Sequence, residues 1–383
     1  MFLPAGSRDE MGPAVSNRFS VMEKFRKVAV LRGYEQISTP VVEYASTFTN
    51  EHVDMKLQNM LKWFNSEGEI EVLRPDWTTS IARALSSQEH KPQKWAYQGS
   101  VFNTDRPGVE YHQAGIEILH MPPLMGESES LLMAHSFLKS LGITDYAIEL
   151  GHTELYESLI QGLDLKSEDA ERLRQAMHDK KQDEVYQIAL NNGDKKTAEE
   201  LAALVDAYGG IEVITEYEER WKERKDLLDM LAHLKKVAQT LVESGANDIL
   251  VDLGRVKNLP YYSGMMYRGF LKKTGAVCFS GGRYDKLYDR YGGHVSAAGL
   301  AFDVDVLAEL YKEESPMKKV CIIANPESLV YAEKLRQTYE GCIVDVQSET
   351  ADLDYYDKIV KIKLIDGKYE VFESETDDRT NQR

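Results

Sequence analysis

Hydrophobic residues recur at intervals of three and four from Val15 to Leu31, which predicts an amphipathic helix. Gly33 follows, and a glycine after the last periodic residue is a typical helix stop. The extended stretch 34–44, YEQISTPVVEY, comes next and has Pro40 in its middle. Because proline lacks the N–H that a central strand uses, we expect this stretch at a sheet edge or at a subunit interface.

Later stretches alternate between apolar and polar residues or form short apolar runs, as strands do. One of them ends near Leu73, and a helix is predicted to begin between residues 76 and 79. Two hairpins are predicted, the second with the turn KKTG at 272–275. The remaining strands are expected at 94–102, 109–119, 145–151, 248–254 and 296–303, and within 261–285.

The stretch 164–243 is charged and rich in Leu and Ala at helical spacing. It predicts a helical insertion that divides a strand-bearing core into a first part, 1–163, and a second part, 244–315. Only the run IEVI at 211–214 within it is strand-like. Strands grouped in hairpins, with helices set apart, indicate an α+β fold rather than a doubly wound sheet.

The character of the chain changes again near residue 316. A strand, a helix and a strand follow one another, which predicts a small α/β domain at 316–372. The polar tail 373–383 is expected to be disordered.

Composition is that of an ordinary globular protein, with Lys+Arg 46 against Asp+Glu 63 and a net charge of −17. A net negative charge disfavours nucleic-acid binding, because that binding depends on clustered Lys and Arg. No apolar run reaches the length of about 18 residues that a membrane span needs, and the first residues do not resemble a secretory signal. The three cysteines show no metal-ligand spacing. We therefore expect a cytoplasmic protein without metal, membrane or nucleic-acid contacts.

The candidate chemistry begins in a hairpin with a predicted turn at Pro107–Gly108. Because strand side chains alternate, Tyr111, Gln113, Gly115 and Glu117 should share one face. That face carries an amide, a carboxylate and a gap at the glycine, which suits a small polar molecule. Gln113 and Glu117, about 13 Å apart, could bracket an amino acid or could belong to a solvated sheet face.

Two further segments have a functional and a structural interpretation. In LRPDWT, Asp76 and Thr78 could hold an ammonium group or could cap the following helix. In LPYYSG, adjacent strand tyrosines would point to opposite faces, so at most one of Tyr261 and Tyr262 is expected to face a pocket.

The segment SGGRYDKL, 280–287, contains a glycine pair that lets the backbone approach something closely. Arg283 or Asp285 could bind a ligand or could form a structural pair. No phosphate-binding loop and no nucleophile-elbow motif appears in the sequence. These residues predict a pocket for a small polar ligand and identify no reaction.

Taken in order, these segments resemble the catalytic core of histidyl-tRNA synthetase. The segment 3–13 resembles that family's opening, and 33–44 resembles class II motif 1, whose proline lies at the dimer interface. The resemblance spans most of 1–313 apart from the insertion. It implies a class II synthetase-like antiparallel sheet flanked by helices, and a dimer with Pro40 at its interface. The segments LRPDWT, YHQAGIE, LPYYSG and GGRYDKL resemble the family's histidine-pocket and sheet segments.

The chain departs from the synthetase where ATP is held. Asn103 stands where motif 2 has an arginine, Val306 where motif 3 has one, and Lys257 where a catalytic arginine precedes the tyrosine pair. A guanidinium binds phosphate bidentately, whereas asparagine and valine cannot, and lysine acts only as a point charge. The resemblance therefore does not extend to aminoacylation.

The residues that match the synthetase family's histidine pocket are chemically suited to bind histidine, unlike those that match its ATP site. This combination resembles the regulatory subunits of ATP phosphoribosyltransferase, which are synthetase paralogues. The resemblance implies a short catalytic partner subunit in the first step of L-histidine biosynthesis, and a hetero-octamer of four regulatory and four catalytic chains. It also implies feedback inhibition by L-histidine as effector, and no cofactor. The residues that match the family's histidine contacts are Asp76, Thr78, Gln113, Glu117 and Tyr262, with Tyr261 beside them.

Three questions stay open at this point. Histidine could bind this pocket or the interface between the subunits. The chain could instead be a divergent class II enzyme that activates histidine or a related amino acid. An RNA-binding paralogue is a third alternative, which the net charge of −17 disfavours.

Overall fold

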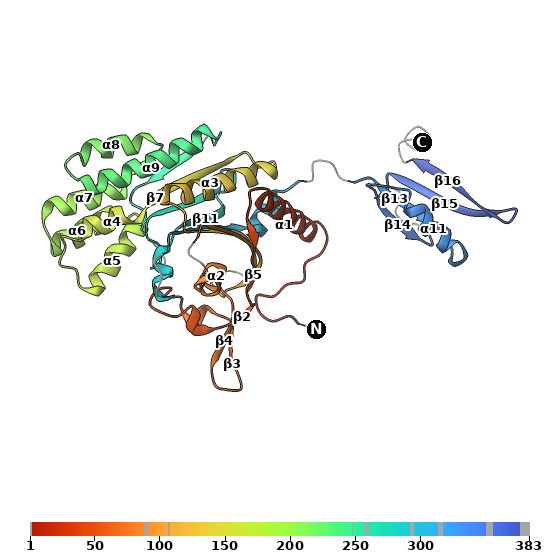
Figure 1. Cartoon of the computed structure of the whole chain (residues 1–383), viewed down its shortest axis with the longest axis horizontal. Helices are drawn as coiled ribbons and strands as arrows, with labels where there is room; N and C mark the ends of the chain where they lie inside the picture. The colour runs from red at the N-terminus through yellow and green to blue at the C-terminus, as the bar shows by residue number, and fades with distance from the viewer. Residues whose placement is uncertain are drawn as a thin grey trace. The chain divides into compact units, whose positions relative to one another are not determined.

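The structure is a computed structural model of the whole chain (Figure 1). It separates into two compact units, Met1–Lys312 and Glu313–Arg383. The residues that it describes are 2–87, 91–105, 108–246, 248–256, 260–291, 295–312, 317–349 and 355–375.

A nine-stranded sheet forms the centre of the first unit. Its central strands pair antiparallel, whereas β1 with β5 and β7 with β9 pair in parallel. Both predicted hairpins, β5 with β6 and β10 with β11, are confirmed. In spatial order the strands are β1 (Glu35–Gln36), β5 (Gln93–Phe102), β6 (Glu110–Leu119), β12 (Ala297–Asp303), β11 (Val277–Arg283), β10 (Met265–Leu271), β7 (Tyr146–His152), β9 (Ile249–Asp252) and β8 (Tyr208–Gly209).

Helices α1 (Pro13–Leu31), α3 (Pro123–Ser140) and α10 (Val304–Leu310) pack near one another. Their contact with the sheet is apolar: the ring of Phe137 lies 5.3 Å from that of Phe25 and 4.7 Å from that of Phe302. Gly33 follows α1 with φ of 78°, a left-handed conformation that favours glycine, so the predicted helix stop is confirmed.

Helix α2 (Trp77–Leu85) lies on the opposite side of the curved sheet from α1 and α3 (Figure 1). Its buried residues pack in a second core cluster with Tyr97, Tyr284 and Tyr288. A three-stranded sheet, β2 (Val42–Tyr44), β4 (Ile70–Leu73) and β3 (Lys62–Phe64), leads into α2. Short 3-10 turns are found at Ala45–Thr47, Leu57–Asn59, Asp285–Leu287 and Asp289–Tyr291.

The stretch predicted as an insertion is helical apart from the short strand β8. The strand-like interpretation of 211–214 was wrong, because Val213 and Ile214 belong to the first turns of α8 and are buried there with Tyr217. The buried residues of this segment are therefore spaced three and four apart, as in a helix, rather than two apart, as in a strand. The helices in this region are α5 (Ser167–His178), α6 (Gln182–Asn192), α7 (Lys195–Val205), α8 (Glu212–Arg220) and α9 (Lys225–Glu243), and α4 (Thr153–Ile160) precedes them.

In its described part, the second unit is a four-stranded sheet in the order β14-β13-β15-β16 with one α-helix, α11 (Leu329–Arg336). Strand β13 pairs in parallel with both of its neighbours, β14 and β15, whereas β15 and β16 pair antiparallel. Because β16 continues to Glu375, the predicted disordered tail does not begin at 373; residues 376–383 lie outside the described part. The strands are β13 (Lys319–Ile323), β14 (Ile343–Gln347), β15 (Lys358–Ile365) and β16 (Lys368–Glu375), and a 3-10 turn is found at Pro326–Ser328.

Among the described residues, no helix combines the length and apolar character that crossing a membrane requires.

Candidate functional site

A cavity of about 160 Å³ lies between the start of α2 and the strands β6, β11 and β12. It gathers most of the residues predicted to form a ligand pocket, although they come from segments far apart in the sequence. Glu117 is not among its lining residues. The lining consists of Asp76, Thr78, Gln113, Tyr261, Tyr262, Ser280, Gly281, Tyr284, Gly299, Leu300 and Ala301.

Asp76 caps α2 and also lines the cavity. Its Oδ2 accepts hydrogen bonds from the Thr79 backbone N–H at 2.7 Å and from Thr79 Oγ1 at 2.6 Å. Burial raises the pKa of Asp76, and the hydrogen bonds from Thr79 oppose that rise. The capping interpretation is confirmed, and the same carboxylate is in place to contact a ligand.

Glu117 lies behind the wall of the cavity, with 1% of its surface exposed. Thr78 Oγ1 donates a hydrogen bond to Glu117 Oε1 at 2.7 Å, and the Tyr284 hydroxyl donates one to Oε2. Burial raises the pKa of Glu117 to about 8; the two hydrogen bonds oppose the rise, and the nearby Asp76 charge adds to it. Both oxygens of this carboxylate are therefore engaged by cavity-lining hydroxyls.

The gap expected at Gly115 is filled by the protein itself. Tyr97 of β5 lies opposite Gly115 of β6, and a Cβ at Gly115 would come within 2.2 Å of the Tyr97 hydroxyl. A similar close approach occurs at Gly299, where a Cβ would lie 2.1 Å from Glu117 Oε2. These glycines make room for a buried hydroxyl and a buried carboxylate rather than for a ligand.

The prediction that at most one tyrosine of the pair faces the pocket was wrong. Tyr261 and Tyr262 precede β10 and lie outside any strand, so strand alternation does not apply to them. Both line the cavity, with ring centroids 5.0 Å apart. Burial raises the pKa of Tyr262 to about 12 and also raises that of Tyr261 well above its ordinary value.

The glycine pair of SGGRYDKL has a packing role. A Cβ at Gly281 would lie 2.2 Å from the Gly299 carbonyl oxygen, and one at Gly282 would lie 2.9 Å from the Tyr262 ring. Arg283 Nε donates to Asp285 Oδ2 at 2.8 Å, so the open choice for these two residues is decided in favour of a structural pair.

The sequence of the chain matches the family model described as histidyl-tRNA synthetase over residues 6–307. It is 33% identical over 313 residues to the ATP phosphoribosyltransferase regulatory subunit of Thermoanaerobacter pseudethanolicus, which covers 80% of this chain and 81% of the relative. The chain belongs to this synthetase-like regulatory-subunit family. The regulatory subunit of Caldanaerobacter subterraneus subsp. tengcongensis is 30% identical over 94% of this chain and 99% of its own length.

Solved structures agree with the predicted fold. An ATP phosphoribosyltransferase regulatory subunit/histidyl-tRNA synthetase from Bacillus halodurans C matches with a TM-score of 0.79 and 25% identity, over 92% of this chain and 95% of that one. Histidyl-tRNA synthetase from Nostoc sp. PCC 7120 matches with a TM-score of 0.77 at 16% identity, over 99% and 98% of the two chains, and shows the fold alone. The predicted class II synthetase-like fold is thus confirmed.

Of the three positions predicted to have lost ATP-binding arginines, Asn103 and Val306 are not among the residues that line the cavity. Asn103 follows β5, and its side chain accepts a hydrogen bond from the Asp105 backbone N–H at 2.9 Å. Val306 lies in α10 and packs, partly buried, against the main core. Lys257 lies outside the described residues. Among the described residues that line the cavity, none is a lysine or an arginine.

Arginines near the cavity are engaged in structural contacts. Arg74 stacks over the Trp77 ring at 3.4 Å and donates to the Ser100 carbonyl at 2.9 Å, and burial lowers its pKa to about 10. Arg255 donates to the buried Glu149 carboxylate at 2.7 Å. Sequence reasoning missed these contacts and also Tyr284, although Tyr284 belongs to the recognised GGRYDKL segment.

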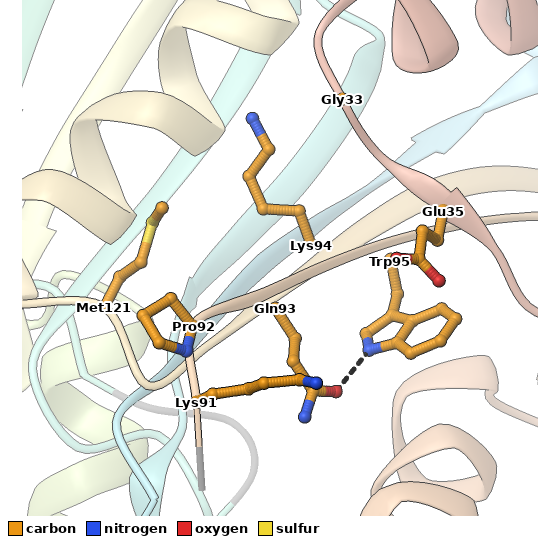
Figure 2. A pocket seen from close by; sticks show the side chains of 8 residues that line it. All are labelled: Gly33, Glu35, Lys91, Pro92, Gln93, Lys94, Trp95 and Met121. Carbon is orange, nitrogen blue, oxygen red and sulfur yellow. Dashed lines mark hydrogen bonds between the residues drawn. The ribbon is translucent and has the colours of Figure 1, made fainter. Parts of the chain in front are cut away.

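A larger hollow of about 620 Å³ lies at the start of β5 and is shown in Figure 2. Its Lys94 donates to the Arg32 carbonyl and to Glu129, and Trp95 Nε1 donates to Gln93 Oε1 at 2.8 Å. It contains none of the predicted ligand-binding residues, so the smaller cavity is the candidate site. No group of three or more His, Cys, Asp or Glu side chains in the described part of the chain is arranged to hold a metal.

Pro40, predicted at a dimer interface, is exposed between β1 and β2. Its neighbours Val41, Val42 and Tyr44 are 42%, 43% and 50% exposed. Apolar surface of this kind beside a sheet edge is typical of an interaction surface, and the interface stays a prediction.

Proposed function

We propose that this chain is a non-catalytic regulatory subunit of ATP phosphoribosyltransferase. It activates a short catalytic subunit in the first step of L-histidine biosynthesis and confers feedback inhibition by L-histidine. The observation that carries this proposal is the chemistry of the cavity, whose described lining offers a carboxylate and hydroxyl groups for an amino acid but contains no lysine or arginine. The names of the curated relatives point to the same role.

The absence of catalysis follows from what ATP would need. A triphosphate develops charge that arginine or a metal must stabilise, and losing one such donor typically costs about 100- to 1000-fold in rate. The asparagine at 103 and the valine at 306 provide no charge, while Arg74 and Arg255 are held by other groups. Adenylation of an amino acid is therefore unsupported in the described part of the chain.

The cavity suits L-histidine as an effector. Asp76 offers a carboxylate for an ammonium group, and Gln113 offers an amide. The rings of Tyr261 and Tyr262 provide flat surfaces against which an imidazole can pack. We place the effector in this cavity rather than at the interface with the catalytic subunit.

The assembly proposed is a homodimer through the stretch 34–44, incorporated into a hetero-octamer with four catalytic chains in the cytoplasm. The exposed Val41, Val42 and Tyr44 around Pro40 support a subunit contact there. Neither a cofactor nor a nucleic acid is required by this role.

The test is reconstitution with a short ATP phosphoribosyltransferase chain. We expect the two chains to co-purify, the catalytic chain to gain activity on mixing, and L-histidine to inhibit the complex. A catalytic chain that is fully active alone would overturn the proposal. Amino-acid-dependent exchange of pyrophosphate into ATP by this chain would instead favour a divergent class II enzyme.

A further inference from the structure

Two β-hairpins, one in each unit of the chain, project from their sheets and carry charges of opposite sign (Figure 1). The first joins β3 to β4 in the unit Met1–Lys312, and the second joins β15 to β16 in the unit Glu313–Arg383. Strands β3 and β16 are each the outer strand of their sheet. Outer strands expose unpaired N–H and C=O groups and are frequent sites of association between chains.

The hairpin β3–β4 is acidic and has exposed aromatic rings. Asn65 holds its turn, because its Oδ1 accepts hydrogen bonds from the backbone N–H groups of Glu67 at 2.9 Å and Glu69 at 3.0 Å. Both glutamates are exposed, and neither is in an ion pair with another described residue. Trp63 and Phe64 are 39% and 73% exposed. Carboxylates beside exposed aromatic rings suit a partner that offers both cations and apolar side chains.

The hairpin β15–β16 has the opposite charge. Asp366 and Gly367 form its two-residue turn, with φ of 48° and 75°, which gives a tight and well-defined hairpin. Lys361 and Lys363 of β15 and Lys368 of β16 are exposed. In the described part of the chain, none of these three lysines is in an ion pair.

Apolar side chains lie among these lysines. Phe372, opposite Lys361, is 44% exposed, and Ile365, opposite Lys368, is 38% exposed. The Lys363 ammonium group lies 5.1 Å from the centroid of the Phe372 ring. Helix α11 packs on the other face of this sheet, and β15 beyond Lys361 pairs only with β16 among the described strands. This face of the hairpin is therefore open to a partner.

Charged side chains on outer strands often serve only to prevent unwanted pairing of sheets. A mixture of both signs serves that purpose, whereas each hairpin here has mainly one sign; the exceptions are Lys62 in the first and Glu370 in the second. The chain as a whole has a net charge of −17. Three unpaired lysines beside exposed apolar side chains in such a chain indicate an acidic partner surface.

We propose that the two hairpins are complementary docking surfaces between two copies of this chain. The cationic hairpin β15–β16 of one copy contacts the acidic hairpin β3–β4 of the other, so that Glu67 and Glu69 meet the lysines. Strand β4 pairs with β2, whose exposed Val42 and Tyr44 belong to the stretch 34–44. The inference rests on the homodimer proposed through that stretch, and it adds a second contact that depends on charge.

The experiment is sedimentation velocity of the full-length chain over a concentration series, in about 50 mM and about 500 mM NaCl. Lys361→Glu combined with Lys363→Glu should weaken self-association about tenfold at the lower salt concentration, because two ion pairs become repulsive. Glu67→Lys combined with Glu69→Lys should have the same effect. A chain with all four substitutions should associate like wild type, because the charges are exchanged between the two hairpins. Wild type itself should associate more weakly at the higher salt concentration.

The matched control changes the net charge equally without touching the hairpin. Lys318→Glu combined with Lys334→Glu affects two exposed lysines of the same unit, one before β13 and one in α11. This variant should associate within about twofold of wild type, because charges outside a contact are largely screened.

The outcomes separate this inference from the proposed homodimer. Wild-type association that is equal at both salt concentrations, or a cationic-hairpin variant that associates like wild type, overturns the inference. If Pro40→Glu dissociates the dimer and the hairpin variants do not, the homodimer stands and the inference alone falls. A wild-type chain that is monomeric at every concentration overturns both.

Two further outcomes concern the occupant of the cationic hairpin. A chain with all four substitutions that associates no better than the two double variants overturns the pairing of these two hairpins. Unchanged self-association together with lost binding of the short catalytic chain would assign the cationic hairpin to that chain, and would overturn the inference as well.

Discussion

Glu117→Gln should stabilise the ligand-free protein at alkaline pH. Glu117 is 1% exposed, and no lysine or arginine in the described part of the chain is hydrogen-bonded to it or paired with it. An ionised carboxylate in such a place is disfavoured, so its proton is held more tightly in the folded state than in the unfolded state. Glutamine has nearly the same shape and can still accept from one hydroxyl while donating to the other.

The magnitude follows from linkage between folding and proton binding. The pKa of Glu117 is raised from 4.5 to about 8, so between these values the folded state binds more protons than the unfolded state. Stability of wild type is therefore full below pH 4.5 and falls as the pH rises toward 8, at up to about 1.4 kcal/mol per pH unit. The advantage of the glutamine variant should grow by about 4 kcal/mol between pH 5 and pH 9.

The assay is unfolding in guanidinium chloride at pH 5, 7 and 9, followed by tryptophan fluorescence. All the tryptophans, at positions 63, 77, 95 and 221, lie in the first unit, so the signal reports the unit that contains Glu117. Glu110→Gln is the matched control, because that carboxylate is exposed at the start of the same strand and should give only a small change. A Glu117→Gln advantage that is equal at pH 5 and pH 9 would refute the reasoning.

Three further substitutions probe packing, charge and association. Gly115→Ala places a Cβ 2.2 Å from the Tyr97 hydroxyl and should cost about 2 kcal/mol or more in denaturant titrations, whereas Gly162→Ala, which meets no atom within 4 Å, should be neutral. Asp76→Asn keeps a capping side chain but removes the charge, so calorimetry should show histidine binding weakened at least about tenfold with little change in Tm. A large fall in Tm would instead assign Asp76 a purely structural role. Pro40→Glu should shift sedimentation toward the monomer, and an unchanged profile would count against the interface.

Local patterns were sufficient for most of the fold. The helix at 15–31 and the hairpins were predictable because their apolar spacing and turn residues agree with the structure that they adopt. The run at 211–214 was not, because four residues do not distinguish a period of two from a period of three and four. Tyr217, one turn further on, is the residue that reveals the buried helical face.

The interior of the site was harder to predict, because the register between β5 and β6 decides which side chains lie opposite one another. The turn predicted at 107–108 includes Pro107, which lies outside the described residues, but the pairing of Phe102 with Glu110 shows the register of the two strands. That register sets Tyr97 opposite Gly115 and fills the expected gap. The position of Tyr284 over Glu117 depends on two segments that are 167 residues apart in sequence, which no local pattern reports.

A cavity whose described lining has no lysine or arginine would respond strongly to the charge of the proposed effector. Asp76 and Glu117 lie close enough that the charge of one raises the pKa of the other, and no lysine or arginine is among the described residues of the lining. We expect the ammonium group of the proposed effector to supply a positive charge beside Asp76, so that its binding would stabilise the core by more than its contacts alone. A large difference in energy between the free and the bound state is what allows a small molecule to shift a conformational equilibrium, and hence to regulate a partner subunit.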